Sequence, residues 1–187
     1  AMSDSNNAIY DPDGIDFETI RHIKEDLRGR VKDYKEVRPS AQVLPTSKDI
    51  WSIKCDVAFP CATQFELDEK DAQTLIDNGC VGVFEGANMP CTLEAAALFI
   101  KNKVIYAPGK ASNAGGVATS GLEIIQNNAN EKWSFEKVDN RLQDIMKNIF
   151  TNIYKTACDL GDKYNLVKGA NNYAFIKIAD MMIEQGR

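Results

Sequence analysis

The 187-residue sequence has no long apolar run, only one histidine and no Cys-x-x-Cys pair. No stretch approaches the ~18–20 apolar residues that a membrane-spanning helix needs, so we expect no contact with a membrane. A zinc site made of cysteine and histidine needs more convergent ligands than the single His22 supplies, so we expect no metal site. The sequence also has no internal repeat and no low-complexity segment. These absences leave a globular protein as the working interpretation.

The five cysteines are an odd number, so they cannot all be paired within one chain. Buried or free thiols in a reducing compartment are the default interpretation of such a set. Residues 1–20 show neither the basic segment nor the apolar segment of a secretory signal peptide. We therefore expect a cytoplasmic protein.

The charge balance is acidic, with 22 Lys and Arg against 27 Asp and Glu and a net charge of −5. Nucleic-acid-binding proteins usually carry a basic surface, so we expect no nucleic-acid partner. Hydrophobic residues make up 44% of the chain and charged residues 26%, which is ordinary for a globular domain. A chain of this length can bury a sizeable core.

Short apolar runs alternate with segments of helical spacing, which indicates a parallel sheet with crossover helices. The expected strands lie at residues 1–3, 55–59, 81–84 and 104–106. The expected helices include residues 17–27, 72–76 and 93–100, and a loop is expected around residues 37–50. From residue 138 the pattern becomes helical, with one apolar stripe over 138–153 and another over 175–182. The sequence thus predicts an α/β domain over residues 1–130 and a helical segment over residues 131–187.

The segment Pro108–Glu123, PGKASNAGGVATSGLE, is the most informative part of the chain. It follows an expected strand and precedes an expected helix over residues 122–129, at the sheet edge where ligands bind in open α/β folds. Gly115 and Gly116 would let the backbone approach a ligand closely, because neither carries a Cβ atom. The residues by themselves are equally compatible with a Gly-rich turn that ends in a Ser/Thr helix cap.

This segment resembles the substrate and nicotinamide loop of hexameric, NADP-specific glutamate dehydrogenases of the Glu/Leu/Phe/Val dehydrogenase family. Four further blocks match in the family's order: SDS at Ser3–Ser5, PCATQFEL at Pro60–Leu67, EGANMP at Glu85–Pro90 and VKGAN at Val167–Asn171. Five ordered blocks make the resemblance specific, and they cover almost the entire chain. The resemblance implies a Rossmann-like fold with C-terminal helices.

The block at Ser3, Asp4 and Ser5 is similar to the tip of the second strand of a dinucleotide-binding unit. There the resemblance implies that Asp4 binds the adenosine ribose and that Ser5 contacts a 2′-phosphate. Lys24 aligns, across a short gap, with a lysine that NADP-specific relatives use for the same phosphate. Without the family, Asp4 would be interpreted as a turn residue and Lys24 as a solvated helix residue.

The blocks after the two expected strands at 55–59 and 81–84 are implied to line the nicotinamide half of the cofactor. Cys61, in the first block, has no plausible histidine base, so we interpret it as a packing residue and not as a nucleophile. The resemblance also assigns contact with the nicotinamide carboxamide to the residue at position 113. The implied cofactor residues of this group are Ala62, Thr63, Gln64, Gly86, Ala87, Asn88 and Asn113.

Val117 and Ser120 resemble the pair that holds the glutamate side chain in the family. Ser120 would donate to the γ-carboxylate, while Val117 would form the pocket wall. A serine hydrolase with Ser120 as nucleophile is not supported, because Gly-x-Ser-x-Gly is absent and His22 lies in another segment.

In a dinucleotide fold, the acidic ribose ligand follows the Gly-x-Gly-x-x-Gly turn by about 20 residues, and here that acid is residue 4. The sequence therefore predicts a C-terminal fragment that lacks the first βα unit and the domain that supplies the catalytic lysines and aspartate. The implied parent enzyme is a homo-hexamer that converts L-glutamate, NADP and water to 2-oxoglutarate, ammonia and NADPH. We expect no catalytic residue in this chain and no activity of the fragment alone. A non-catalytic binding or assembly module on the same fold is the alternative.

Overall fold

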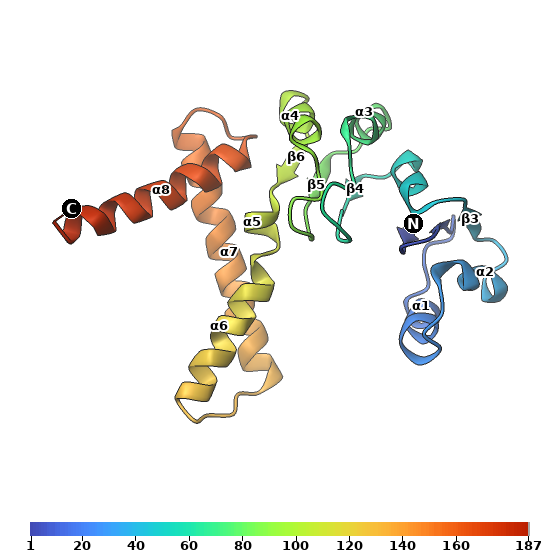
Figure 1. Ribbon diagram of the computed structural model, residues 1–187, viewed down its shortest axis with the longest axis horizontal. Coiled ribbons are helices and arrows are strands. Elements are labelled where there is room, and N and C mark those ends of the chain that lie inside the picture. Colours follow the sequence, from blue (N-terminus) through green and yellow to red (C-terminus); the bar gives the residue numbers. More distant parts are fainter. Residues whose placement is uncertain (187) are drawn as a thin grey trace.

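The computed structural model describes residues 1–186. An antiparallel sheet, a parallel sheet and a set of long helices follow one another along the chain and across the molecule (Figure 1). The α/β class, the parallel sheet and the C-terminal helices are therefore confirmed. The separate antiparallel sheet at the N-terminal end was not anticipated by the sequence pattern.

The antiparallel sheet consists of β1 (Met2–Ser3), β2 (Ala8–Tyr10) and β3 (Gln42–Leu44), in that order. Strand β1 pairs with β2 and not with a parallel neighbour, because the short turn after residue 3 returns the chain directly alongside it. The prediction of a loop around residues 37–50 was wrong in part. Strand β3 lies within it and a 3₁₀ helix at Ser47–Ser52 overlaps its end, and the residues of β3 are too little buried to give an apolar pattern.

Short helices cover one side of this antiparallel sheet. They are α1 (Phe17–Arg21), a π-helical turn at His22–Asp26, a 3₁₀ turn at Val31–Asp33 and α2 (Tyr34–Val37). The apolar periodicity of residues 17–27 therefore predicted a helix correctly, although its second half is π-helical. The buried residues of this small core are Ile9, Ile20, Ile23, Val31, Tyr34 and Ala41.

The parallel sheet consists of β4 (Val57–Ala58), β5 (Gly82–Phe84) and β6 (Ile105–Ala107), in that order. The crossover helices α3 (Glu69–Asp77) and α4 (Leu93–Lys101) lie side by side at the same end of the molecule in Figure 1. All five elements fall where the sequence predicts them. Phe99, Val83 and Leu75 are fully or almost fully buried between helices and sheet, and they form the centre of the larger core.

The segment that follows β6 is helical and not a loop. Helix α5 (Gly109–Ser112) begins immediately after Pro108, and helix α6 (Ala114–Asn128) follows it after Asn113. The expectation that the helix starts near residue 122 was therefore wrong. Gly116 has open space where a Cβ would lie, and a Cβ on Gly115 would make ordinary contacts, so neither glycine is needed for a close approach within this chain.

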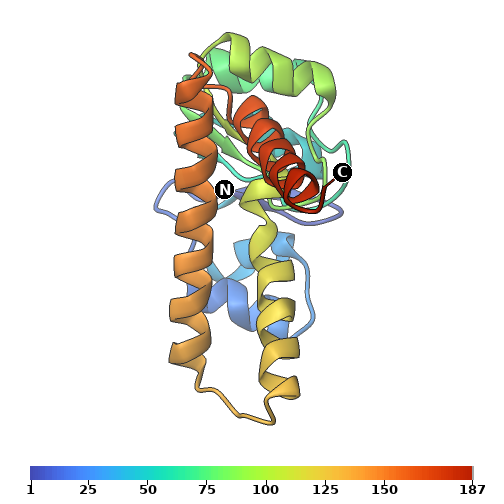
Figure 2. The ribbon, with the colours of Figure 1, turned by 90° about the vertical axis from the view of Figure 1, so that its left-hand side faces the viewer.

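Helix α7 (Phe135–Asp159) runs back along α6, and α8 (Leu166–Glu184) crosses the far end of α7 (Figures 1 and 2). The chains of α7 and α8 approach so closely that a Cβ on Gly169 would collide with the Ile153 carbonyl. Beyond this crossing α8 projects away from the body of the molecule in Figure 1. Its apolar stripe is largely exposed, with 70% of Phe175 accessible to solvent.

Candidate functional site

The loops after β4 and β5 meet at the carboxyl end of the parallel sheet. The N–H groups of Gly86 and Ala87 both donate to the Pro60 carbonyl, at 2.9 and 3.2 Å. A Cβ on Gly86 would collide with the Cys61 thiol, so only glycine fits at this approach. The two loops thus form one continuous edge at the point where ligands bind in open α/β sheets.

Asn113, at the junction of α5 and α6, joins this edge through its side-chain amide. Its Nδ2 atom donates to the Ala87 carbonyl at 3.1 Å and to Asn88 Oδ1 at 2.8 Å. The structure therefore brings together three predicted cofactor residues from two segments. A predicted nicotinamide site at this edge is compatible with the geometry and remains a prediction.

Two residues of these loops have left-handed backbones, Phe65 with φ 57° and Met89 with φ 49°. They face each other, and the Phe65 N–H donates to the Met89 carbonyl at 3.0 Å. Non-glycine residues in this region are uncommon and are concentrated at functional sites. No sequence pattern signalled this pair.

The predicted residues Ala62, Thr63 and Gln64 lie on the loop after β4, and all three are exposed. The Ala62 N–H donates to Glu66 Oε1 at 2.8 Å, which holds the first turn of the loop in place. The Thr63 hydroxyl and the Gln64 amide are thus accessible to a ligand at the sheet edge.

Glu85, directly after β5, is buried, and sequence reasoning gave it no role although it begins the EGANMP block. Its carboxylate accepts from the Tyr106 hydroxyl at 2.5 Å and from the Gly109 N–H at 2.6 Å. Burial raises the pKa of Tyr106, and the hydrogen bond to Glu85 raises it further. Burial likewise raises the pKa of the Cys91 thiol, with the charge of Glu85 adding to the effect, so Cys91 is a protonated packing residue.

Asp4, directly after β1, has its carboxylate engaged by other groups of the protein. Burial alone would raise its pKa, but hydrogen bonds from the N–H groups of Val31, Asn6 and Asn7, together with the Lys24 ammonium, lower the pKa to about 2. The Val31 N–H lies 3.0 Å and Lys24 Nζ 3.5 Å from Oδ2. The structure thus brings Asp4 and Lys24 together, and their role in binding the cofactor remains a prediction.

Ser5 lies beside a cation that sequence reasoning missed. The Arg30 guanidinium donates to the Ser5 hydroxyl at 3.0 Å. Arg30, Lys24 and Ser5 therefore present two positive charges and a hydroxyl within one surface region. Ser5 and Arg30 are 25 positions apart, and the chain between them carries no local signal of this contact, because α1 and a π-helical turn intervene.

Val117 and Ser120 lie on α6, and both are exposed. The Ser120 hydroxyl donates to the Gly116 carbonyl at 3.2 Å, one turn back in the helix. Positions 113, 117 and 120 lie along one face of a helix, so the two residues extend the surface that Asn113 begins. The structure gives them no direct contact with the loops after β4 and β5, and their role remains a prediction.

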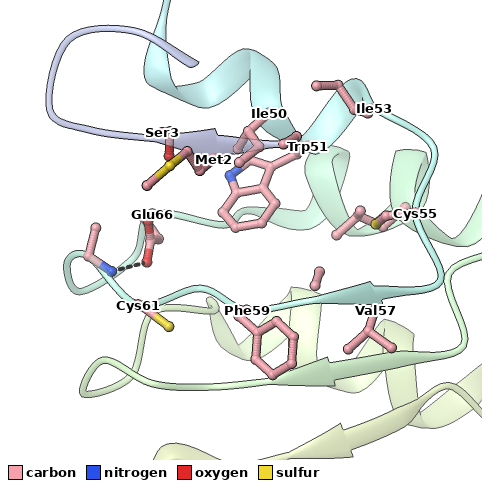
Figure 3. Close-up of a pocket in the computed structure, with 14 residues that line it drawn as sticks. Met2, Ser3, Ile50, Trp51, Ile53, Cys55, Val57, Phe59, Cys61 and Glu66 are labelled. Atoms are coloured by element: carbon pink, nitrogen blue, oxygen red, sulfur yellow. Dashed lines mark hydrogen bonds between the residues drawn. The ribbon is translucent and has the colours of Figure 1, made fainter. Parts of the chain in front are cut away.

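A pocket of about 450 Å³ separates β1 from β4. Figure 3 shows Met2 and Ser3 on one side, Val57 and Phe59 on the other, and the Trp51 ring between them. Ser3 and Ala62 both line this pocket, so it connects the two groups of predicted cofactor residues. Within residues 1–186, no cluster of side chains could hold a metal ion, and no helix is long and apolar enough to cross a membrane.

Comparisons with known proteins agree on one family. A model of the Glutamate/Leucine/Phenylalanine/Valine dehydrogenase family matches residues 1–186. An NADP-specific glutamate dehydrogenase of Helicobacter pylori is 50% identical over 190 residues, and one of Haemophilus influenzae is 46% identical over 188. The match covers 98% of this chain in both cases, but only 42% and 41% of the relatives.

The crystal structure of Plasmodium falciparum glutamate dehydrogenase superposes with a TM-score of 0.90 at 44% identity. The superposition covers 99% of this chain and 40% of that structure. The chain thus spans about two fifths of the length of the relatives it matches. On the family match over residues 1–186 and this structural similarity, the chain belongs to the Glutamate/Leucine/Phenylalanine/Valine dehydrogenase family.

Proposed function

We propose that this chain is the coenzyme-domain part of an NADP-dependent glutamate dehydrogenase. The enzyme oxidises L-glutamate with NADP and water to 2-oxoglutarate, ammonia and NADPH. Residues 1–130 form part of the dinucleotide-binding domain, and residues 131–187, of which the structure describes 131–186, form a C-terminal helical segment. The observation that carries the proposal is the meeting of Asn113 with the Gly86–Asn88 loop at the carboxyl end of the parallel sheet.

The residues of this chain fit a phosphorylated dinucleotide at its adenosine end and at its nicotinamide end. Arg30, Lys24 and Ser5 offer charge-assisted donors to the 2′-phosphate of NADP. Asp4 does not oppose that phosphate as a free carboxylate would, because three backbone N–H groups and Lys24 already engage it. Ser3, beside the pocket, belongs to the same adenosine side.

At the nicotinamide end, Gly86 lets the two loops approach each other, and the loop residues Ala62, Thr63, Gln64, Ala87 and Asn88 line the edge with Asn113. When bound, the nicotinamide supplies the acceptor for the hydride that leaves the substrate Cα. The protein's task is to hold the ring against that carbon. Asn113 suits this task because its amide is already fixed by two acceptors.

The substrate lies on the α6 side of this edge. Val117 forms a wall of its pocket, and Ser120 donates a hydrogen bond to the γ-carboxylate. A Ser120 hydroxyl that now bonds a helix carbonyl can bond a carboxylate by rotating about χ1. The catalytic lysines and aspartate come from the rest of the enzyme, as the family resemblance implies.

The pocket between β1 and β4 supports the proposal that this chain is part of a larger fold. Strand β1 is at one edge of its sheet and β4 is at one edge of the other, so both present unpaired backbone groups toward the pocket. One further strand in this position would join the two sheets. The first βα unit of the dinucleotide fold, with its glycine turn, supplies such a strand.

The exposed apolar side chains of α8 support the same proposal. Phe175, Ile178 and Ile183 are 56–71% accessible, which is unusual for large apolar residues gathered on one helix. We place the substrate domain of the enzyme against this helix. A homo-hexamer in the cytoplasm is the assembly that the family resemblance implies.

The test is an assay of the full-length, mass-verified enzyme that carries this chain. We expect glutamate-dependent formation of reduced nicotinamide with NADP, and a much lower kcat/KM with NAD. A protein that binds NADP but oxidises no glutamate would instead be a non-catalytic module on the same fold. A protein that does neither would contradict the proposal.

A further inference from the structure

We propose that Glu85 is a positioning residue, whose buried carboxylate fixes the loop after β5 against the start of α5 and thereby sets the positions of Asn88 and Asn113. The inference rests on the proposed function, because it assigns these two asparagines to the nicotinamide end of the site. Glu85 itself is 3% exposed and lies below the surface that a ligand reaches.

The carboxylate connects three segments of the chain. Oε1 accepts from the Tyr106 hydroxyl on β6 at 2.5 Å and from the Cys91 N–H at 3.2 Å. Oε2 accepts from the Gly109 N–H, in the first turn of α5, at 2.6 Å. Both ends of the loop after β5 are therefore tied to the segment that follows β6.

The donors around this carboxylate are two backbone N–H groups and a phenol, and none of them is a cation. A buried polar group that lacks hydrogen-bond partners is costly, and here both carboxyl oxygens of Glu85 have donors. A side chain with fewer acceptor atoms would leave at least one of these buried donors unsatisfied. The two oxygens of Glu85 thus hold the three donors in fixed positions relative to one another.

Two further contacts fix the distance between the loop and α5. The Ser112 hydroxyl donates to the Glu85 carbonyl at 2.5 Å. A Cβ on Gly109 would lie 2.8 Å from the Ala87 carbonyl and 3.2 Å from Glu85 Oε2, so α5 is seated against the loop with no spare room. A change at Glu85 therefore has to move α5 or the loop.

Asn113 follows Ser112 directly, so any movement of α5 changes where its amide lies. The contacts of that amide with Ala87 and Asn88 depend on the spacing that Glu85 sets. A misplacement of about 1 Å at a reacting centre can lower a rate about a hundredfold. Glu85 acts on the nicotinamide position through Asn88 and Asn113, without touching the ligand.

The test is Glu85→Gln in the full-length enzyme. The amide keeps the size of the side chain but offers only one acceptor oxygen. In either orientation its NH₂ group faces a backbone donor, the N–H of Cys91 or that of Gly109. We expect kcat to fall about tenfold or more while KM for NADP changes less than about threefold, because the adenosine half of the site is untouched. The primary isotope effect with Cα-deuterated glutamate should rise, since hydride transfer becomes slower than the other steps.

Two tyrosine variants complete the test, one expected to share the effect and one a matched control. Tyr106→Phe removes one of the three donors to Glu85 and should shift kcat and the isotope effect in the same direction by a smaller factor. Tyr34→Phe removes an equally buried hydroxyl, which bonds Asp11 and the Asp16 N–H in the N-terminal sheet, and should leave the isotope effect unchanged. Comparison with Tyr34→Phe thereby separates a general effect of losing a buried hydroxyl from a displacement of the loop and α5.

Hydrogen exchange without coenzyme gives a readout that does not depend on activity. In Glu85→Gln, or in Tyr106→Phe if the first variant does not fold, peptides covering 85–91 and 105–113 should exchange faster than in the wild type. An active wild type whose variants show unchanged exchange and an unchanged isotope effect would overturn the inference and leave the proposed function standing. An inactive wild type would overturn the proposed function first.

Discussion

The Arg30 guanidinium donates to the Ser5 hydroxyl at 3.0 Å, and Lys24 reaches the neighbouring Asp4 from the other side. Two cations thus converge on the turn that follows β1. We propose that these two cations bind the 2′-phosphate of NADP, since charge-assisted donors suit a phosphate, and this proposal predicts how the two coenzymes respond to mutation.

Arg30→Ala and Lys24→Glu should each raise KM for NADP far more than KM for NAD in the full-length enzyme. A charge-assisted hydrogen bond is worth about 1.5–3 kcal/mol, so we expect at least about a tenfold change for NADP. Lys32→Ala, which removes an exposed cation from the same segment, is the control and should affect neither coenzyme. Equal effects on both coenzymes would mean that Arg30 and Lys24 are surface residues only.

Ser120→Ala should lower kcat/KM for glutamate about tenfold or more, because a hydrogen bond to a charged group is worth about 1.5–3 kcal/mol. Activity with norvaline, which has no γ-carboxylate, should fall much less. Thr119→Ala is the matched control, since its hydroxyl also bonds a helix carbonyl one turn back. If glutamate and norvaline lose activity equally, Ser120 supports the helix and does not bind the γ-carboxylate.

Asp4→Asn should lower the melting temperature of the full-length enzyme at pH 7. The folded-state pKa of about 2 lies below the ordinary value of 3.8, so the ionised carboxylate stabilises the fold above pH 4. This contribution is lost as the pH falls from about 4 to about 2, and the difference between wild type and variant should shrink over that range. Melting curves from about pH 7 to about pH 2 measure it, and a difference independent of pH would contradict the assignment.

Residues 1–187 alone should show no glutamate-dependent reduction of NADP and only weak coenzyme binding. The edges of β1 and β4 carry unpaired backbone groups, so the isolated chain should also unfold in part or associate. The measurement is the absorbance of reduced nicotinamide together with light scattering, on a mass-verified sample. Turnover above a no-enzyme control would mean that this chain holds catalytic groups of its own.

Adding the N-terminal part of the enzyme as a separate chain should restore activity if its first strand enters the pocket between β1 and β4. The same part without that strand is the control and should restore none. Restoration by both would place the association elsewhere, for example on the exposed apolar side chains of α8.

The sequence by itself determined the parallel sheet and its two crossover helices. Their signals are local: apolar runs of strand length and helical spacing between them. It also indicated the sheet edge at which we propose the site, because ligands bind at the carboxyl ends of the strands in open α/β sheets. The family resemblance rests on sequence blocks of the same local kind.

Only the tertiary structure decided the rest. The glycines of residues 109–121 predicted a loop, but packing against α7 makes this segment helical, since tertiary contacts override weak intrinsic propensity. The contacts of Arg30 with Ser5 and of Glu85 with Gly109 join residues 25 and 24 positions apart, so they depend on how intervening elements fold. Local patterns determine which elements form, whereas the positions of charged side chains are set by packing between elements distant in the sequence.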